Sequence, residues 1–363
     1  MEIVLYIFIA FLALTVLVFF HELGHFLVAR YFGVKVERFS IGFGIPIFKK
    51  VINGTEWVFA PILVGGYVKM KGQDDLNPLA KSSDPDSYNS KKPWQKILIL
   101  LAGPFANLIL AFFIYFFIAL NGAPITTASG YIAPIVGEVA KDSPAFKAGL
   151  KEGDKIIKVG NYNIKYWYQI TKSIQKSKDP ISIVIIRDGK REVLTLNTKV
   201  VDDKNVFGER IKRRIIGIRP KIPDINSKID FTLLDALKYA YNETINATML
   251  ISKGVGKVAT GEVDSKNIGG AITIFDLIQK FAQKGFLYLL FIMALISVNL
   301  GVLNLLPIPA LDGGHIMFNL YELITRRELN ERVYMTLTAM GWAFLLFLMF
   351  FGLYNDVNRL WLH

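Results

Sequence analysis

The sequence predicts a multi-pass α-helical membrane protein with four transmembrane helices, a membrane-associated β-hairpin region and one inserted α+β domain. The first observation is composition: 52% of the 363 residues are hydrophobic and the mean hydropathy is +0.38, which is high for a soluble globular protein. The second is that four apolar runs are long enough to cross a bilayer. The third is that short strand-like stretches separated by turn residues occupy residues 122–220. The absence of cysteine excludes disulfides and thiolate metal sites.

The first apolar run, residues 3–20, is broken only by Thr15 and has about the length that crosses a bilayer as a helix. It lacks the basic start and the small-residue cleavage site of a signal peptide, so we expect a retained helix that continues through Arg30. The other three expected spans are residues 97–120, 286–306 and 333–354. Four spans would place both termini on the same side of the membrane.

Basic residues in the connections predict the orientation of these helices. Those between the first and second spans are Lys35, Arg38, Lys49, Lys50, Lys69 and Lys71, and those between the third and fourth are Arg326 and Arg327. By the positive-inside rule these connections face the cytoplasm, whereas both termini and the long segment between the second and third spans lie outside it. Because most basic residues flank apolar runs, the net charge of +12 favours the lipid bilayer and not nucleic acid as a partner.

Residues 122–220 are predicted to form a small β-rich domain. Its strand candidates are residues 132–139, 154–159, 181–187 and 192–196, with Asp188-Gly189 as a hairpin turn. The stretch Ser143-Pro144-Ala145-Phe146-Lys147-Ala148-Gly149-Leu150-Lys151-Glu152-Gly153-Asp154 resembles the short helix and turn of a PDZ domain of the bacterial protease type. PDZ domains bind peptide ends by adding a strand to a sheet edge, so we expect peptide ends as partners. The alternative is an inert spacer.

Two further segments are expected to lie against the membrane or the domain. In residues 221–285, the residues at helical spacing are Leu233, Leu237, Ala240, Tyr241 and Thr244, which predicts an amphipathic helix in this linker. Residues 39–48 and 57–70 combine strand-like residues with glycines and predict a β-hairpin or small sheet, which must be buried in protein or line a water-filled cavity. The chain is therefore divided into residues 1–121, 122–220, 221–285 and 286–363.

The first span ends in a motif typical of metal sites. His21-Glu22-Leu23-Gly24-His25 has the pattern HExxH, and residues four apart on a helix share one face, so both imidazoles can reach one metal ion. Glu22 is the candidate general base. The alternative is a pair of buried histidines satisfied by hydrogen bonds. An acidic residue in a span is costly and usually marks function, which favours the metal site.

A catalytic zinc site generally has three protein ligands and one open position. The remaining histidines are His315 and His363; the last residue of the chain is a poor candidate, so the third ligand is His315 or an acidic residue. In Asn304-Leu305-Leu306-Pro307-Ile308-Pro309-Ala310-Leu311-Asp312-Gly313-Gly314-His315, the prolines cannot sustain a regular helix, which places Asp312 on unwound chain. Its side of the membrane and its depth agree with those of the HExxH motif. Asp312 could instead cap the helix that follows.

HExxH at the end of a first span, the PDZ-like stretch and the NLLPIPALDGG segment in a later span together resemble the site-2 protease family of intramembrane zinc metalloproteases. The resemblance covers essentially the whole chain and is closest to the bacterial regulator-of-sigma-E protease branch. It implies that Asp312 is the third zinc ligand, with Zn²⁺ as the cofactor. It also implies that Asn304 lies near the substrate backbone. The hairpin at Gly66, Tyr67 and Val68 would offer an edge strand to the substrate.

Two other comparisons with that family follow from the sequence. Gly103-Pro104-Phe105-Ala106-Asn107 matches the GPxxN of the family's second span, for which we expect a structural role. Only one PDZ signature is present, where some relatives carry two, so gating by a tandem pair is not expected here.

The resemblance implies hydrolysis of peptide bonds in single-span membrane proteins or their truncated stubs, as in the regulated intramembrane proteolysis of anti-sigma factors or the removal of signal-peptide remnants. The expected location is the bacterial inner membrane, with the active site toward the cytoplasmic side and both termini and the PDZ domain outside. One alternative is a non-catalytic, membrane-anchored PDZ scaffold, which leaves HExxH without a purpose. A metal transporter is a second alternative, but no inverted repeat typical of carriers is evident.

Overall fold

The computed structural model describes residues 2–73, 82–205, 207–224, 227–262 and 269–361. The chain forms two compact units. The membrane unit comprises Met1–Ile118 and Leu233–His363, and the inserted unit comprises Ala119–Thr232. The inserted unit therefore interrupts the membrane unit in sequence.

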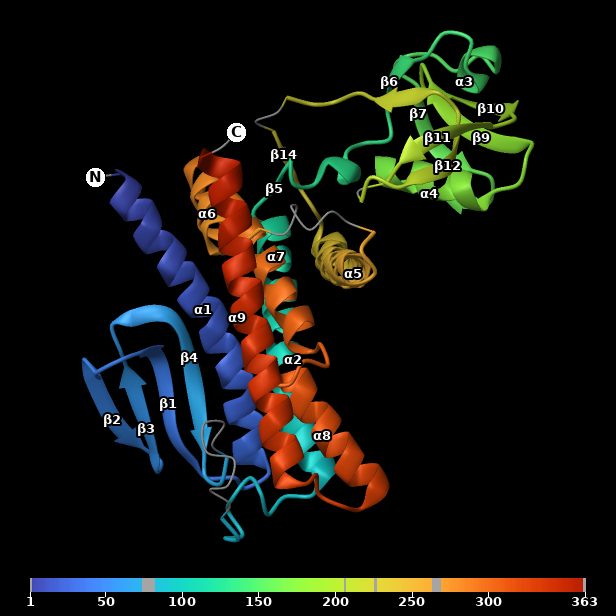
Figure 1. Cartoon of the computed structure of the whole chain (residues 1–363). Helices are drawn as coiled ribbons and strands as arrows, with labels where there is room; N and C mark the ends of the chain where they lie inside the picture. Colours follow the sequence, from blue (N-terminus) through green and yellow to red (C-terminus); the bar gives the residue numbers. More distant parts are fainter. Residues whose placement is uncertain (1, 74–81, 206, 225–226, 263–268, 362–363) are drawn as a thin grey trace. The chain divides into compact units, whose positions relative to one another are not determined.

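Helices make up most of the membrane unit (Figure 1). They are α1 (Glu2–Tyr31), α2 (Pro93–Leu120), α5 (Leu233–Ala259), α6 (Ala271–Lys284), α7 (Phe286–Asn304), α8 (Asp312–Thr325) and α9 (Glu331–Trp361). Within the described residues, four stretches are long and apolar enough to cross a membrane: Leu5–Tyr31, Pro93–Leu120, Phe286–Asn304 and Glu331–Arg359. The four predicted spanning helices are thus confirmed.

The third spanning helix, α7, ends two residues before the predicted end of the span. The amides of Leu305 and Leu306 bond to the carbonyls three residues back, at 3.2 and 3.0 Å, so the helix tightens at its last turn. Pro307 follows and has no amide hydrogen to continue the helical ladder. Helix α7 therefore ends at Asn304, whose side chain lies near His21 of α1.

The amphipathic helix predicted in the linker is present as α5, and it buries part of the predicted stripe. Ala240 and Thr244 of the predicted stripe are buried together with Tyr239, whereas Leu237 and Tyr241 are 40% and 60% exposed. Tyr239 packs edge to face on Tyr115 of α2, which explains why this face turns inward. In Figure 1, α5 is seen nearly end-on while α2, α7 and α9 are seen from the side, so α5 crosses them. Its apolar outer side chains are consistent with a lipid environment.

The first connection folds into a four-stranded sheet that packs beside α1. Its strands are β1 (Val36–Phe43), β2 (Phe48–Ile52), β3 (Thr55–Phe59) and β4 (Ile62–Met70), in the order β2-β3-β1-β4. Strand β1 runs antiparallel to β4 and parallel to β3. Phe39 is fully buried, stacks on Trp57 at 4.6 Å between ring centroids and packs edge to face on Phe26 of α1. The predicted small sheet is therefore present, and β4 is one of its two edges.

The inserted unit is an α+β structure. Its strands are β5 (Ala123–Pro124), β6 (Val136–Val139), β7 (Lys155–Val159), β8 (Tyr162–Asn163), β9 (Ile181–Arg187), β10 (Lys190–Leu196), β11 (Lys199–Lys204), β12 (Arg210–Ile215), β13 (Ile218–Pro220) and β14 (Lys228–Ile229). Its helices are η1 (Ser129–Tyr131), α3 (Pro144–Lys147) and α4 (Trp167–Lys176). The largest sheet has the order β10-β9-β7-β8, and its core includes the fully buried Ile156, Ile183 and Ile185.

The turn residues of this unit behave as the sequence predicts. Asp188 and Gly189 both have positive φ, 49° and 77°, and join β9 to β10 as the expected hairpin. The predicted strand at residues 132–139 is shortened to β6, since Pro134 precedes it and cannot donate a ladder hydrogen bond. The short helix of the PDZ-like stretch is α3, whose first turn is capped by the Ser143 hydroxyl at 3.1 Å from the Phe146 amide.

Candidate metal centre

The two histidines of HExxH lie on one face of α1, which is helical throughout this stretch. Both are buried, at 7% and 6% exposure, and their Nε2 atoms are 3.3 Å apart. Four residues on a helix correspond to slightly more than one turn, so the local structure alone brings the two imidazoles together.

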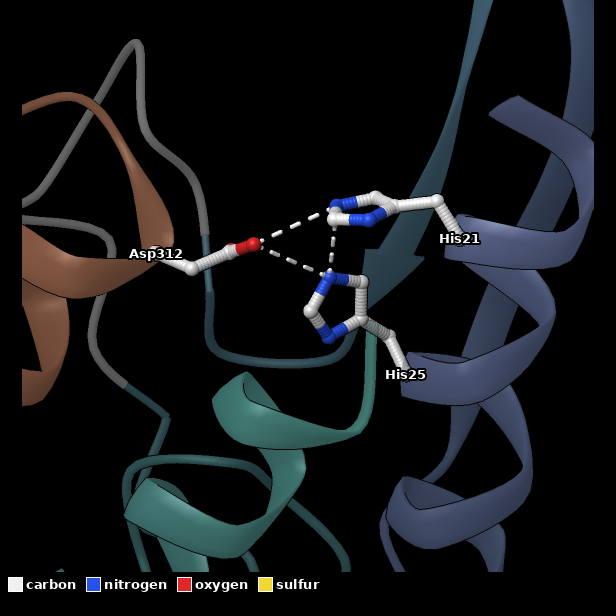
Figure 2. A group of neighbouring side chains, drawn as sticks. All are labelled: His21, His25 and Asp312. Carbon is white, nitrogen blue, oxygen red and sulfur yellow. Dashed lines mark hydrogen bonds and ion pairs between the residues drawn. The ribbon is translucent and has the colours of Figure 1, made fainter. Parts of the chain in front are cut away.

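Asp312 approaches this pair from a segment far away in the sequence. Its Oδ2 lies 3.2 Å from Nε2 of His21 and 3.5 Å from Nε2 of His25 (Figure 2). The three ligand atoms all lie within 4.8 Å of one another. The structure therefore brings together the HExxH motif of α1 and the start of α8, the two segments that the sequence singled out.

Asp312 is the first residue of α8 and does not lie on unwound chain as the sequence predicts, because the unwound segment ends at Leu311. That segment, between α7 and α8, is tightly folded against the glycines that follow Asp312. A Cβ on Gly313 would lie 2.2 Å from the Leu306 carbonyl oxygen, and one on Gly314 would lie 2.4 Å from that of Ile308. Ala310 has φ of 91°, a strained value for a residue with a side chain. The glycines after Asp312 thus allow a close approach of backbone to backbone that no other residue permits.

The donor set fits a zinc ion. For zinc–ligand bonds of about 2.0–2.1 Å in a tetrahedron, the ligand atoms should be about 3.3–3.4 Å apart. The observed separations of 3.2, 3.3 and 3.5 Å agree with that value. Oδ2 of Asp312 is buried and makes no hydrogen bond within the described residues, which is the situation of an oxygen that faces a cation.

The protonation of His25 also suits metal binding. Its Nδ1 lies 2.8 Å from the backbone carbonyl oxygen of Ile99 in α2. A carbonyl can only accept, so Nδ1 donates its hydrogen and the lone pair of a neutral imidazole is left on Nε2. That atom is the one that faces His21 and Asp312.

His315, the alternative third ligand, is placed elsewhere. Its Nδ1 lies 3.1 Å from the hydroxyl of Tyr334 in α9, and it does not belong to the cluster of ligand atoms among the described residues. The capping alternative for Asp312 is not borne out either, because Leu311 is the N-cap of α8 and no side chain caps that helix. His363 lies outside the described residues.

Glu22, the candidate general base, is partly buried beside the same three residues. Its carboxyl group lies close enough to His25, His21 and Asp312, and to the backbone of Val68 in β4, to interact with them electrostatically. The edge strand and the motif on α1 are therefore neighbours.

Of the residues expected to contact substrate, Asn304 lies at this centre and Val68 lies beside Glu22. The side-chain nitrogen of Asn304 lies 3.4 Å from Nε2 of His21. Gly66, Tyr67 and Val68 lie in β4, which pairs only with β1 among the described strands. The Tyr67 hydroxyl accepts a hydrogen bond from Arg38 at 3.3 Å.

One residue near the ligands was not assigned to the site from sequence. The amide of Asn107 in α2 lies 3.2 Å from Nδ1 of His21. The available signal was the spacing of Gly103 and Asn107, which share one face of α2. Sequence reasoning gave that motif a structural role only, since nothing in it indicated which helix this face meets.

Comparison with known proteins identifies the family. The pattern of peptidase family M50 matches residues 9–348. The chain is similar to a protein from Campylobacter jejuni that is named a zinc metalloprotease. The two are 45% identical over 96% of this chain and 92% of the relative. It is also similar to proteins with the same kind of name in Helicobacter pylori, at 35% identity over 97% of this chain and 99% of the relative, and in Clostridium acetobutylicum, at 33% identity over 96% of each. With four apolar helices and this match along almost its whole length, the chain belongs to peptidase family M50, the site-2 proteases, and is an integral membrane zinc metalloprotease.

Proposed function

We propose that this protease hydrolyses peptide bonds inside or beside the bilayer, in single-span membrane proteins or in stubs left by an earlier cut. The observation that carries the proposal is the origin of the ligand atoms. His21 and His25 lie in the spanning helix α1, and Asp312 follows the end of the spanning helix α7. A metal held by these three residues would lie at the depth of the spans.

The proposed metal ligands are His21, His25 and Asp312. A zinc ion in this position supplies a Lewis acid that polarises the scissile carbonyl and makes water a better nucleophile near neutral pH. Glu22 accepts a proton from the attacking water and then donates it to the leaving amide nitrogen. The backbone of Val68 lies near the Glu22 carboxyl group and favours its ionised form.

The substrate backbone is proposed to bind between β4 and Asn304. A transmembrane helix hides its amides in internal hydrogen bonds and must unwind before attack. Pairing with the open edge of β4, at Gly66, Tyr67 and Val68, would satisfy the freed groups. Asn304, close to His21, supplies an amide that can bond to the same backbone.

The inserted unit is proposed to act as a PDZ domain that filters or docks substrates by their ends. Its α4 and the residues at 213–219 border a cleft of about 280 Å³. Trp167, Ile170 and Ile174 supply apolar side chains to that cleft, and Arg213 and Arg219 supply charge at its rim. This combination suits an extended peptide with an apolar end. Substrates of this kind include anti-sigma factors in regulated intramembrane proteolysis and signal-peptide remnants.

The location proposed is the bacterial inner membrane, with the metal centre toward the cytoplasm. The support is the distribution of Lys and Arg in the connections. Both termini and the inserted unit would then lie outside the cytoplasm.

Replacement of Glu22 by Gln tests the proposed function. Native membranes that carry the wild-type chain are compared, by mass spectrometry, with membranes that carry Glu22→Gln at equal level. We expect single-span stubs to accumulate only with Glu22→Gln, because the variant keeps the metal ligands and loses the base. Glu37→Gln, a change at a glutamate of β1 that pairs with Lys69, is the control and should behave as wild type. Equal stub levels in all three membranes, with folded and zinc-loaded protein, would contradict the proposal.

A further inference from the structure

We propose that Asn107 is a positioning residue that keeps the proton of His21 on Nδ1 and so directs the lone pair of Nε2 toward the metal. The inference rests on the proposed role of His21 as a ligand. It gives the GPxxN segment of α2 a chemical role in addition to packing.

The Asn107 side chain is completely buried and faces the ring atom of His21 that points away from Asp312. Its amide lies 3.2 Å from Nδ1 of His21, whereas Nε2 of His21 faces Oδ2 of Asp312. The backbone of Asn107 is itself held, because the fully buried Ser297 of α7 donates a hydrogen bond to its carbonyl at 2.8 Å. The backbone that carries this side chain is thus held against α7.

The metal determines which atom of the amide faces His21. A neutral imidazole carries one proton, and a ligating Nε2 must be free of it, so Nδ1 carries the proton and needs an acceptor. The oxygen of Asn107 can take this place by a half-turn of the amide, whose two ends have nearly the same shape. Oδ1, which otherwise is buried without a partner, then accepts from Nδ1. After the half-turn, the side-chain nitrogen of Asn107 and not its oxygen lacks a hydrogen-bond partner. Hydrogen bonding alone therefore does not select one orientation of the amide, and the role of His21 as a metal ligand does.

His25 is supported in the same way from the same helix. The Ile99 carbonyl accepts from its Nδ1, and Gly103 leaves room for the ring, since a Cβ there would lie 2.2 Å from Nε2 of His25. Ile99, Gly103 and Asn107 are spaced by four residues and share one face of α2. One face of one helix therefore orients both imidazoles.

The test is the affinity of the purified full chain for zinc, measured by competition with a chromophoric chelator. Asn107→Ala removes the acceptor, and we expect affinity about 10- to 100-fold weaker, as for other groups that orient metal ligands. Asn107→Asp keeps an acceptor for Nδ1 and should remain close to wild type. Asn319→Ala is the matched control: Asn319 is also buried and donates one hydrogen bond, to the His315 carbonyl, and its loss should leave affinity unchanged.

A second measurement needs no variant. In the zinc-loaded wild type with ¹⁵N-labelled histidine, NMR should show the proton of His21 on Nδ1. A bare Nδ1, or an Asn107→Ala protein that folds and binds zinc like wild type, would overturn the inference, as would an Asn107→Asp protein as weak as Asn107→Ala. Neither the zinc affinity nor the NMR measurement depends on proteolysis. A chain that binds zinc as expected and cleaves nothing contradicts only the proposed function.

Discussion

At the scale of residues, the structure favours one of the two candidates that the sequence left open for the third metal ligand. Asp312 faces both imidazoles, and His315 faces Tyr334. We expect Asp312→Asn to weaken zinc binding by at least about tenfold, because an amide oxygen carries no charge to offset that of the cation. His315→Gln should bind zinc like wild type. Metal analysis after equilibrium dialysis of both proteins checks this, and the reverse ranking would contradict the assignment.

How much of the site could be predicted depends on how close its residues are to one another in the sequence. His21 and His25 are related by one helical turn, so their convergence follows from sequence spacing alone. Asp312 could be placed only by the proline-containing segment that precedes it and by a family resemblance. Asn107 was missed, because its role depends on which face of α2 meets α1, and the spacing of an almost wholly apolar helix does not reveal that.

At the scale of elements, the same limit explains the result for α5. Of the predicted stripe, the structure buries the small Ala240 and Thr244, whereas the larger Leu237 and Tyr241 are exposed. In a soluble protein, the larger apolar residues would face the core. Next to lipid both faces can be apolar, and small side chains allow closer helix packing, so hydrophobicity does not indicate the inner face.

In the inserted unit, a largely buried ion pair links the turn before β7 to the end of β9. Asp154, with a side chain 1% exposed, pairs with Arg187 at 2.7 Å and also accepts from the Lys151 amide at 2.8 Å. We expect Asp154→Ala to destabilise the unit by about 3 kcal/mol, since it removes the buried carboxylate that faces Arg187 and leaves that guanidinium only the more exposed Glu192 and the Gly149 carbonyl. Hydrogen exchange of the β7 and β9 amides in the full chain would measure this.

The exposed pair of Asp203 and Arg213 in the β11–β12 hairpin serves as the comparison. Asp203→Ala should leave the exchange of β7 and β9 almost unchanged, because exposed ion pairs contribute little. If both replacements changed hydrogen exchange of β7 and β9 equally, the buried pair would contribute no more to the stability of this unit than the exposed pair.

At the scale of the whole molecule, the proposed orientation can be tested with the chain's own composition. The protein has no cysteine, so a single introduced one reports its side of the membrane without background. In intact spheroplasts, a membrane-impermeant maleimide should label Lys204→Cys, in β11 of the inserted unit. It should reach Arg327→Cys, between α8 and α9, only after permeabilisation, and the cysteine-free wild type should give no signal. Labelling of Arg327→Cys alone in intact cells would reverse the orientation.

The distance in sequence between the ligands has a consequence for biosynthesis. His21 and His25 enter the membrane with the first helix to be made, but Asp312 follows the third spanning helix, after the inserted unit has been translated. A ribosome-bound chain therefore holds two imidazoles and no carboxylate to complete the centre. With the proposed ligand set, the newly made protein would gain protease activity only after nearly all of it has been synthesised. Stalled chains that end before Asp312 should bind zinc more weakly than those that end after α8 has emerged from the ribosome.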